Sequence, residues 1–185
     1  MKSVARANGV SVHAIAGTHC VLLAMDAEPE QRQNLKGFAI RKEDVAAGER
    51  QWLRGFKFFE DLIPDPQPGE RRSTLEHPIQ SFLWGHYSAT PGRQYRYTVR
   101  PMYGEPGSLS AGPDITVDVR TEATDQGRHA VFFNRGAIPS QKFADQFGNR
   151  GPADVNDPEA EDVKWLSRGL LQAMLDFIGQ ARGSQ

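Results

Sequence analysis

The segment that most constrains the fold runs from residue 87 to residue 121 and contains two runs of alternating side chains. Pro91 and Gly92 predict a turn before the first run, because proline fixes φ and glycine accepts positive φ. Alternation with a period of two is typical of strands that have one buried and one solvated face. The apolar members are Tyr95, Tyr97, Val99, Ile115, Val117 and Val119. A buried face requires a second sheet opposite it, so this segment predicts a β-sandwich.

Residues before this segment supply further strand candidates. Apolar or alternating runs predict strands at 10–15, 19–26, 37–41 and 79–87, and with the two runs above they give a sandwich of about seven strands. The stretch at about 41–78 is longer than such a sandwich needs, so we expect an insertion folded against one sheet. Its aromatic residues, concentrated at 52–59, are expected to pack internally, the alternative being a ligand or partner patch.

The segment at 87–121 resembles the closing strands of a fibronectin type III domain. The resemblance rests on the pattern PGxxYxYxVxPxYG followed by SAGPxxxVxVRT. It implies that Tyr95, three residues after Pro-Gly, makes the hydrogen bond known as the tyrosine corner. Binding modules, receptors and enzyme appendages all carry this fold, so the resemblance implies no particular activity.

The chain changes character after residue 121. The hydrophilic stretch 122–128 predicts a linker between a sandwich at 1–121 and a short α/β tail at 129–185. In the tail we expect a short strand at 130–133, a short helix at 139–147 and a longer final helix. Asp157 is the predicted cap of that helix and Pro158 its first residue. A wide apolar stripe from Trp165 to Ala181 requires a surface to pack on, either further protein or the sandwich itself.

The tail also resembles a second family. HAVFFNRGAIPSQKFADQF at 129–147 and WLSRGLLQAMLDFI at 165–178 are similar to the entry of the catalytic region in bacterial phospholipase D-like proteins, and VHAIAGTHCVLLAMD, KGFAIRKED, WLRGFKFF and EHPIQSFLWGHYSA are similar to the segment that precedes it. The resemblance implies that the chain is the front of a longer, truncated phosphodiesterase. The remainder of the phospholipase D-like domain would then be its partner in the same chain.

No catalytic residue transfers from that family. Phospholipase D-like enzymes use two His-x-Lys-x4-Asp motifs, in which one histidine attacks phosphorus and the other acts as the general acid. The five histidines of this chain are never followed two positions later by lysine. Those positions hold Ile15, Val21, Ile79, Ser88 and Val131.

Three residues of the tail are candidate substrate-binding residues: Asn134, Arg135 and Lys142. An Arg-Gly pair after a predicted strand, followed by a helix that carries a lysine, can approach an anionic substrate once a further domain completes a cleft. The alternative is that Arg135 only belongs to a turn. No cofactor or metal is indicated, because His13 and His19 have no acidic or thiol ligand at a regular spacing.

Composition limits the partners. The 22 basic and 23 acidic residues are interspersed and give a net charge of −1, so nucleic acid is not indicated. The single cysteine, Cys20, lies in an apolar run and predicts a buried free thiol. No run approaches the roughly 20 apolar residues of a membrane span, and a cytoplasmic location is expected.

Two functions follow from these observations. The first is a noncatalytic N-terminal accessory region of a phospholipase D-like phosphodiesterase, which positions the catalytic domain or recruits substrate. The second is a self-contained sandwich that binds other proteins and carries a docking helix. In either case the apolar helix stripe favours a homodimer if it is exposed. A complete small hydrolase would need a catalytic site that the sequence does not display.

Overall fold

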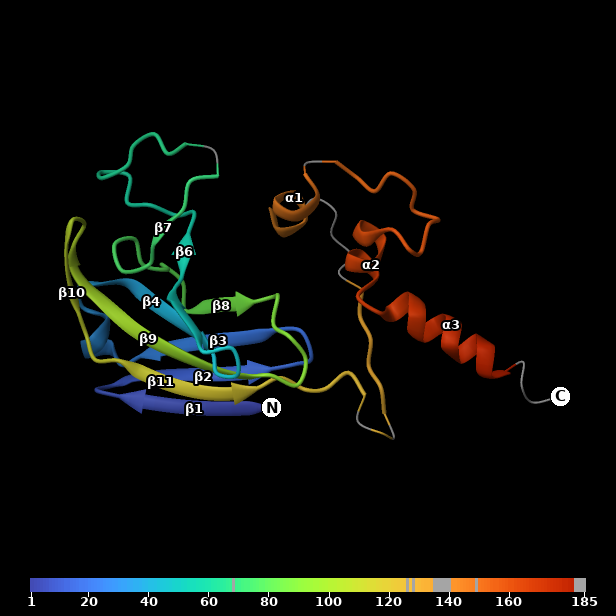
Figure 1. Ribbon diagram of the computed structural model, residues 1–185. Helices are drawn as coiled ribbons and strands as arrows, with labels where there is room; N and C mark the ends of the chain where they lie inside the picture. The colour runs from blue at the N-terminus through green and yellow to red at the C-terminus, as the bar shows by residue number, and fades with distance from the viewer. Residues whose placement is uncertain (68, 126, 128, 135–140, 149, 182–185) are drawn as a thin grey trace. The chain divides into compact units, whose positions relative to one another are not determined.

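The computed structural model describes residues 1–181 except 68, 126, 128, 135–140 and 149. Contacts divide the chain into two units, Met1–Ala123 and Thr124–Gln185. The first unit carries the named strands and one short 3-10 helix, and the second carries the α-helices (Figure 1).

The first sheet has four antiparallel strands in the order β1-β2-β3-β8. Their bounds are Lys2–Ala7, Val10–Ala16, Val21–Ala27 and Leu83–His86. In β2 and β3 every second residue is buried, as the alternation of side chains along a strand requires. The 3-10 helix η1, Pro29–Arg32, follows β3 and leads the chain to the second sheet.

The second sheet is built around one long strand, β9, Gln94–Glu105. One edge of β9 pairs with β4, while the other edge pairs first with β11 and then with β10. Strand β5 extends the sheet beyond β4. The bounds of these partners are Leu35–Asp44 for β4, Glu49–Trp52 for β5, Ser108–Ala111 for β10 and Ile115–Arg120 for β11.

The two sheets stack as layers around one apolar core (Figure 1). Both contribute fully buried side chains: Val12, Val21, Leu23, Phe38, Ile40, Tyr97, Val99 and Val117. The fold class predicted from the sequence, a mainly β sandwich followed by a short tail with helices, is therefore confirmed, although the described part of the predicted α/β tail contains helices and no named strand. The sandwich has more strands than expected, because β1 was not predicted and because β5 lies within the segment interpreted as an insertion.

The tyrosine corner predicted at Tyr95 is present. Its ring is buried, and its hydroxyl oxygen accepts a hydrogen bond from the backbone N–H of Thr90 at 2.9 Å. The Thr121 hydroxyl donates to the Thr90 carbonyl at 2.6 Å and accepts from the Arg93 N–H at 2.9 Å. These bonds join the turn before β9 to the end of β11.

A buried hydroxyl attaches residues 53–79 to the sandwich, since the Thr74 hydroxyl accepts a hydrogen bond from the Ile40 N–H of β4 at 3.2 Å. Within the segment itself, His77 Nδ1 accepts a hydrogen bond from the Phe59 N–H at 3.2 Å. Burial lowers the pKa of His77, which favours the neutral ring that can accept this bond. Within the segment, β6 (Arg54–Gly55) and β7 (Arg72–Ser73) form a two-stranded ribbon.

Two expectations for the first unit were wrong. Cys20 is exposed rather than buried. Its carbonyl accepts a hydrogen bond from the Gly17 N–H at 2.9 Å, so Cys20 closes a turn, and the inward alternation of β3 begins at Val21. The strand expected at 79–87 is only Leu83–His86, because Ile79 pairs instead with Phe38 of the other sheet.

The second unit contains α1 (Gln141–Phe147), α2 (Glu161–Ser167) and α3 (Leu170–Ala181). The buried Phe143 contacts Phe147 and Trp165, with ring centroids 5.0 and 5.6 Å apart. The helix predicted at 139–147 matches α1, although its first two residues lie outside the described part of the chain. The strand predicted at 130–133 is not formed, because Ala130 makes only an isolated bridge with Asp125.

The single final helix predicted from Asp157 is also wrong. The Asp157 carboxylate accepts a hydrogen bond from the Glu159 N–H at 2.9 Å and closes a turn, and α2 begins later, at Glu161. The helix then ends at Arg168 and Gly169, whose φ angles of 47° and 81° are left-handed. A glycine in this conformation commonly ends a helix, so the apolar stripe is divided between α2 and α3.

Two tyrosines of β9 provide a matched test of the tyrosine corner. We expect Tyr95→Phe to lower the free energy of unfolding by about 1 kcal/mol, because the Thr90 N–H loses the buried tyrosine hydroxyl as its acceptor. The Tyr103 hydroxyl is buried without a hydrogen-bond partner among the described residues, so Tyr103→Phe should be neutral or stabilising. Urea unfolding of both variants measures this. An equal loss of unfolding free energy in the two variants would contradict the assignment of Tyr95 as the tyrosine corner.

Candidate functional site

The structure does not assemble the substrate site predicted in the tail. Asn134 is exposed and belongs to no helix or strand. Arg135 and the side chain of Lys142 lie outside the described residues. The proposed grouping of these three residues thus stays a prediction.

The largest pKa shifts lie in an aromatic cluster inside the sandwich. His86 Nδ1 and the Tyr97 hydroxyl oxygen are 2.7 Å apart and hydrogen-bonded, and both side chains are buried. Burial lowers the pKa of His86 to about 4, with a smaller contribution from Lys42, and burial also raises the pKa of Tyr97. Trp84 and Tyr95 pack against the His86 ring. This pair is closed off in the core, which fits packing rather than catalysis.

The outer face of the five-stranded sheet carries a row of paired charges around Trp52. The Arg100 guanidinium lies 4.8 Å from the Trp52 ring and donates to both carboxylate oxygens of Asp114, at 2.6 and 3.0 Å. This hydrogen bonding lowers the pKa of Asp114. Arg41 lies on the same ring at 5.3 Å and donates to the Thr98 hydroxyl at 3.2 Å.

A neighbouring pair extends this row, since Arg96 Nε donates to Asp118 at 2.9 Å. Each of these guanidinium groups already has an acceptor within the sheet. An anion would therefore have to displace an existing bond, and the row stabilises the surface instead of offering an anion site. Arg96, Thr98 and Arg100 alternate with the inward residues of β9 and so share its outer face, although Thr98 itself is buried there. This alternation did not reveal Trp52, because the pairing of β5 with β4 has no signal in the local pattern.

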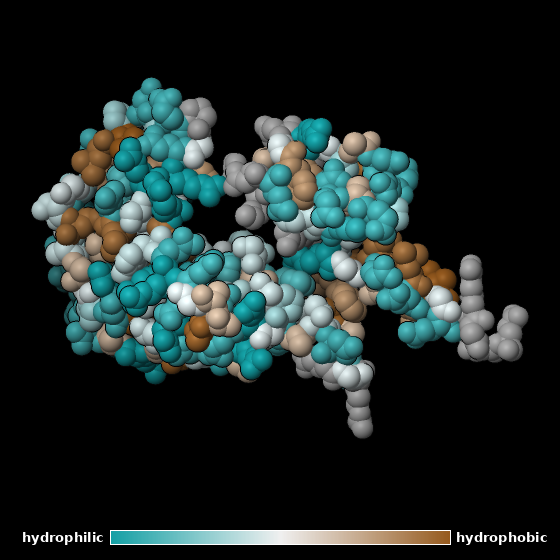
Figure 2. Space-filling model, viewed as in Figure 1, coloured by the Kyte–Doolittle hydropathy of each residue, from teal (hydrophilic) through white to brown (hydrophobic). Residues whose placement is uncertain are grey.

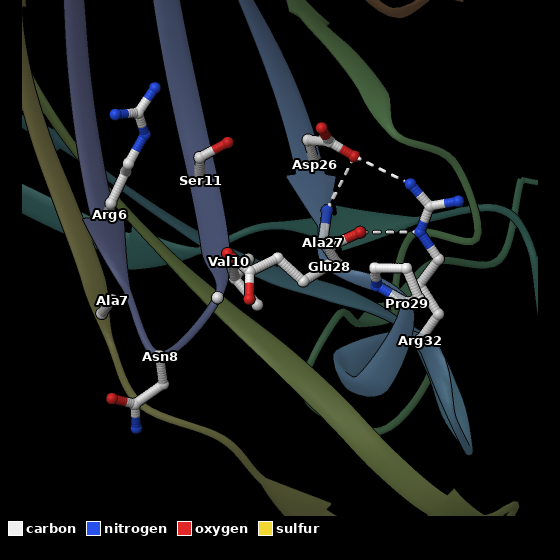
Figure 3. Close-up of a pocket in the computed structure, with 11 residues that line it drawn as sticks. Arg6, Ala7, Asn8, Val10, Ser11, Asp26, Ala27, Glu28, Pro29 and Arg32 are labelled. Carbon is white, nitrogen blue, oxygen red and sulfur yellow. Dashed lines mark hydrogen bonds and ion pairs between the residues drawn. The ribbon is translucent and has the colours of Figure 1, made fainter.

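A polar hollow of about 600 Å³ lies between the β1–β2 turn and η1. Figure 3 shows Asp26 turned toward Arg32, which donates to it at 3.1 Å and to the Ala27 carbonyl at 2.7 Å. Arg6 and Glu28 also line the hollow. These four charged side chains are all exposed, so water and salt screen the interactions between them.

The second unit presents an uncovered apolar surface on α3. Four large side chains of this helix are exposed: Met174, Leu175, Phe177 and Ile178. We call them the α3 apolar face, and Figure 2 shows brown atoms along this helix. Phe177 is the most exposed of the four, at 74 %. Water exposure of such a face is unfavourable, which makes it a candidate docking surface.

Within the described residues, no group of three or more His, Cys, Asp or Glu side chains is placed to hold a metal ion. None of the described helices is both long and apolar enough to cross a membrane.

No family model matches the chain, and no curated protein matches it significantly. The fibronectin-like and phospholipase D-like resemblances therefore stay predictions.

The His86–Tyr97 pair predicts a specific acid sensitivity. The pKa of His86 in the folded state, about 4, lies below the value of about 6.5 expected when the chain is unfolded. The contribution of neutral His86 to the free energy of unfolding is therefore complete above about pH 6.5 and is lost as the pH falls toward about 4. The slope of unfolding free energy against pH is at most about 1.4 kcal/mol per pH unit for one such group.

Urea unfolding between pH 4 and pH 7.5 tests this expectation. His86→Gln should be less stable than the native chain near neutral pH but should show a smaller slope on the acid side, because it has no imidazole to protonate. The same slope in both proteins would show that His86 does not control the acid sensitivity.

Proposed function

We propose that this chain is a noncatalytic accessory module, in which the sandwich is a self-sufficient scaffold and the α3 apolar face docks on further protein. The single observation that carries the proposal is the exposure of that face. Full burial of a large apolar side chain stabilises by about 1.5–3 kcal/mol. Docking would remove the exposed part of each of these four side chains from water, which favours association.

The proposed occupant of the face is the remainder of a phospholipase D-like phosphodiesterase domain in the same chain. The resemblance of residues 129–147 and 165–178 to that family supports this choice. In such a protein the sandwich positions the catalytic domain or recruits its substrate. Asn134, Arg135 and Lys142 lie in the segment proposed as the start of that domain and would then approach an anionic substrate in its completed cleft.

A second copy of the chain is the alternative occupant. Asp176 is the only ionisable residue between Leu170 and Ala181, so two copies of α3 meet little charge repulsion. This alternative corresponds to a self-contained interaction module that dimerises through its C-terminal helix. Its signature is a dimer in solution.

The coding DNA beyond codon 185 distinguishes these functions. The accessory proposal predicts an open reading frame that continues and encodes at least one His-x-Lys-x4-Asp motif. A stop codon directly after Gln185 would contradict the phosphodiesterase proposal and favour the interaction module.

Substitutions in α3 test the docking surface itself. We expect Met174→Glu combined with Phe177→Glu to reduce the binding of an apolar dye by the isolated chain several-fold, since the charges break up the apolar face. Gln180→Glu, at an exposed polar position of the same helix, is the matched control and should bind dye like the native chain. In a longer protein that contains the phosphodiesterase domain, only the double variant should lower the melting temperature. Equal effects of the double variant and of Gln180→Glu on dye binding and melting temperature would show that the α3 apolar face is not a docking surface.

A further inference from the structure

Strand β8 forms one edge of the four-stranded sheet and pairs with β3. The Phe82 carbonyl accepts a hydrogen bond from the Met25 N–H at 2.7 Å, which sets the phase of the ladder. In an antiparallel pair, successive residues direct their backbone groups to opposite edges. The backbone groups of Trp84 and His86 therefore face β3, and those of Leu83 and Gly85 face away from it.

The backbone groups of β8 that face away from β3 are mostly without hydrogen-bond partners among the described residues. The Leu83 N–H donates to the Ser81 hydroxyl at 3.1 Å. The N–H and C=O of Gly85 have no hydrogen-bond partner among the described residues. This edge thus offers a donor and two acceptors, counting the Leu83 carbonyl, in the spacing of a strand.

Apolar side chains border these groups. Leu83 is 57 % exposed and Tyr87 is 75 % exposed. The Tyr87 ring lies over Gly85, and a Cβ atom at Gly85 would be 2.6 Å from the tyrosine hydroxyl oxygen, so glycine is what lets the ring lie there. On the same face the exposed Leu22 of β3 is opposite Gly85 and the exposed Ile15 of β2 is opposite Leu22.

The usual protections of a sheet edge are weak at this strand. Residues Leu83–His86 include neither proline nor lysine, which natural proteins place on edges to prevent pairing. Of the usual protections, the short length of β8, four residues, is the one present at this strand. Directly before the strand, Gln80, Ser81 and Phe82 line a groove of about 380 Å³ together with Phe38 and Phe59. The groove provides space for a side chain at the end of an added strand.

We propose that the free edge of β8 binds an extended polypeptide segment, which adds to the four-stranded sheet as one more strand. The Gly85 backbone and the Leu83 carbonyl supply the main-chain hydrogen bonds. Apolar side chains at alternate positions of the bound segment extend the exposed row of Ile15, Leu22 and Tyr87. The inference concerns the sandwich and does not depend on α3, so it can hold or fail separately from the proposed function.

Nuclear magnetic resonance on the full chain tests this site with a defined probe, an acetylated peptide of alternating threonine and valine with a lysine at each end. We expect the largest shift changes at Leu83, Gly85 and Tyr87, and about tenfold slower amide exchange at Gly85 when the peptide is bound. The same peptide N-methylated on its edge-facing residues should not bind, because it lacks the required donors. Equal binding of both peptides, or no change at Gly85, would overturn the proposal.

Two lysine substitutions localise the effect. Leu83→Lys should weaken peptide binding about tenfold or more, because a charged edge residue opposes strand addition. Val4→Lys places the same charge at an exposed position of β1, at the opposite edge of the same sheet, and should leave binding within about twofold of native. Without peptide, amide exchange at Gly85 that becomes slower as the protein concentration increases would identify a second copy as the occupant. That result would also overturn the proposal. If Leu83→Lys fails to fold, the comparison of the two peptides still decides.

Discussion

Strand β9 is the constraint on which the sandwich depends. Its inward side chains, Tyr95, Tyr97 and Val99, enter the core, while its two edges hold β4 on one side and β10 and β11 on the other. The Tyr95 hydroxyl then fixes the turn that leads into the strand. Because the largest buried side chain of the core, Tyr97, comes from this strand, the facing residues of β2 and β3 are packed against it.

The same strand explains the character of the outer surfaces. Alternation that directs tyrosine and valine inward also directs Arg96 and Arg100 outward, where each meets a carboxylate of the adjacent chain segment. That face is therefore occupied by its own ion pairs. The four-stranded sheet differs, since its outer face carries exposed apolar residues and its edge at β8 leaves the backbone of Gly85 unpaired within the described residues. Among the described surfaces of the sandwich, this edge is the one most suited to a partner.

The sequence predicted the parts of the fold that short-range patterns control. Period-two alternation located β2, β3, β9 and β11, and Pro91-Gly92 followed by Tyr95 located the corner. Strand β1 was missed because its alternate residues are alanines and a serine, which give little apolar signal. Cys20 was misplaced because an apolar run does not reveal where a turn ends and a strand begins. The break at Arg168 and Gly169 was missed because the apolar stripe continues across it. The predicted substrate-binding residues stay a prediction, because Arg135 and the side chain of Lys142 lie outside the described residues.

The central claim is that the sandwich is stable by itself while the α3 apolar face is exposed among the described residues. Hydrogen exchange of the isolated monomer tests it most directly, because amides exchange according to the free energy of local opening. The account predicts strong protection in β2, β3 and β9 and exchange in α3 faster by several orders of magnitude. Protection of α3 equal to that of β9 would contradict the account, since it would show that the helix is already packed within the chain.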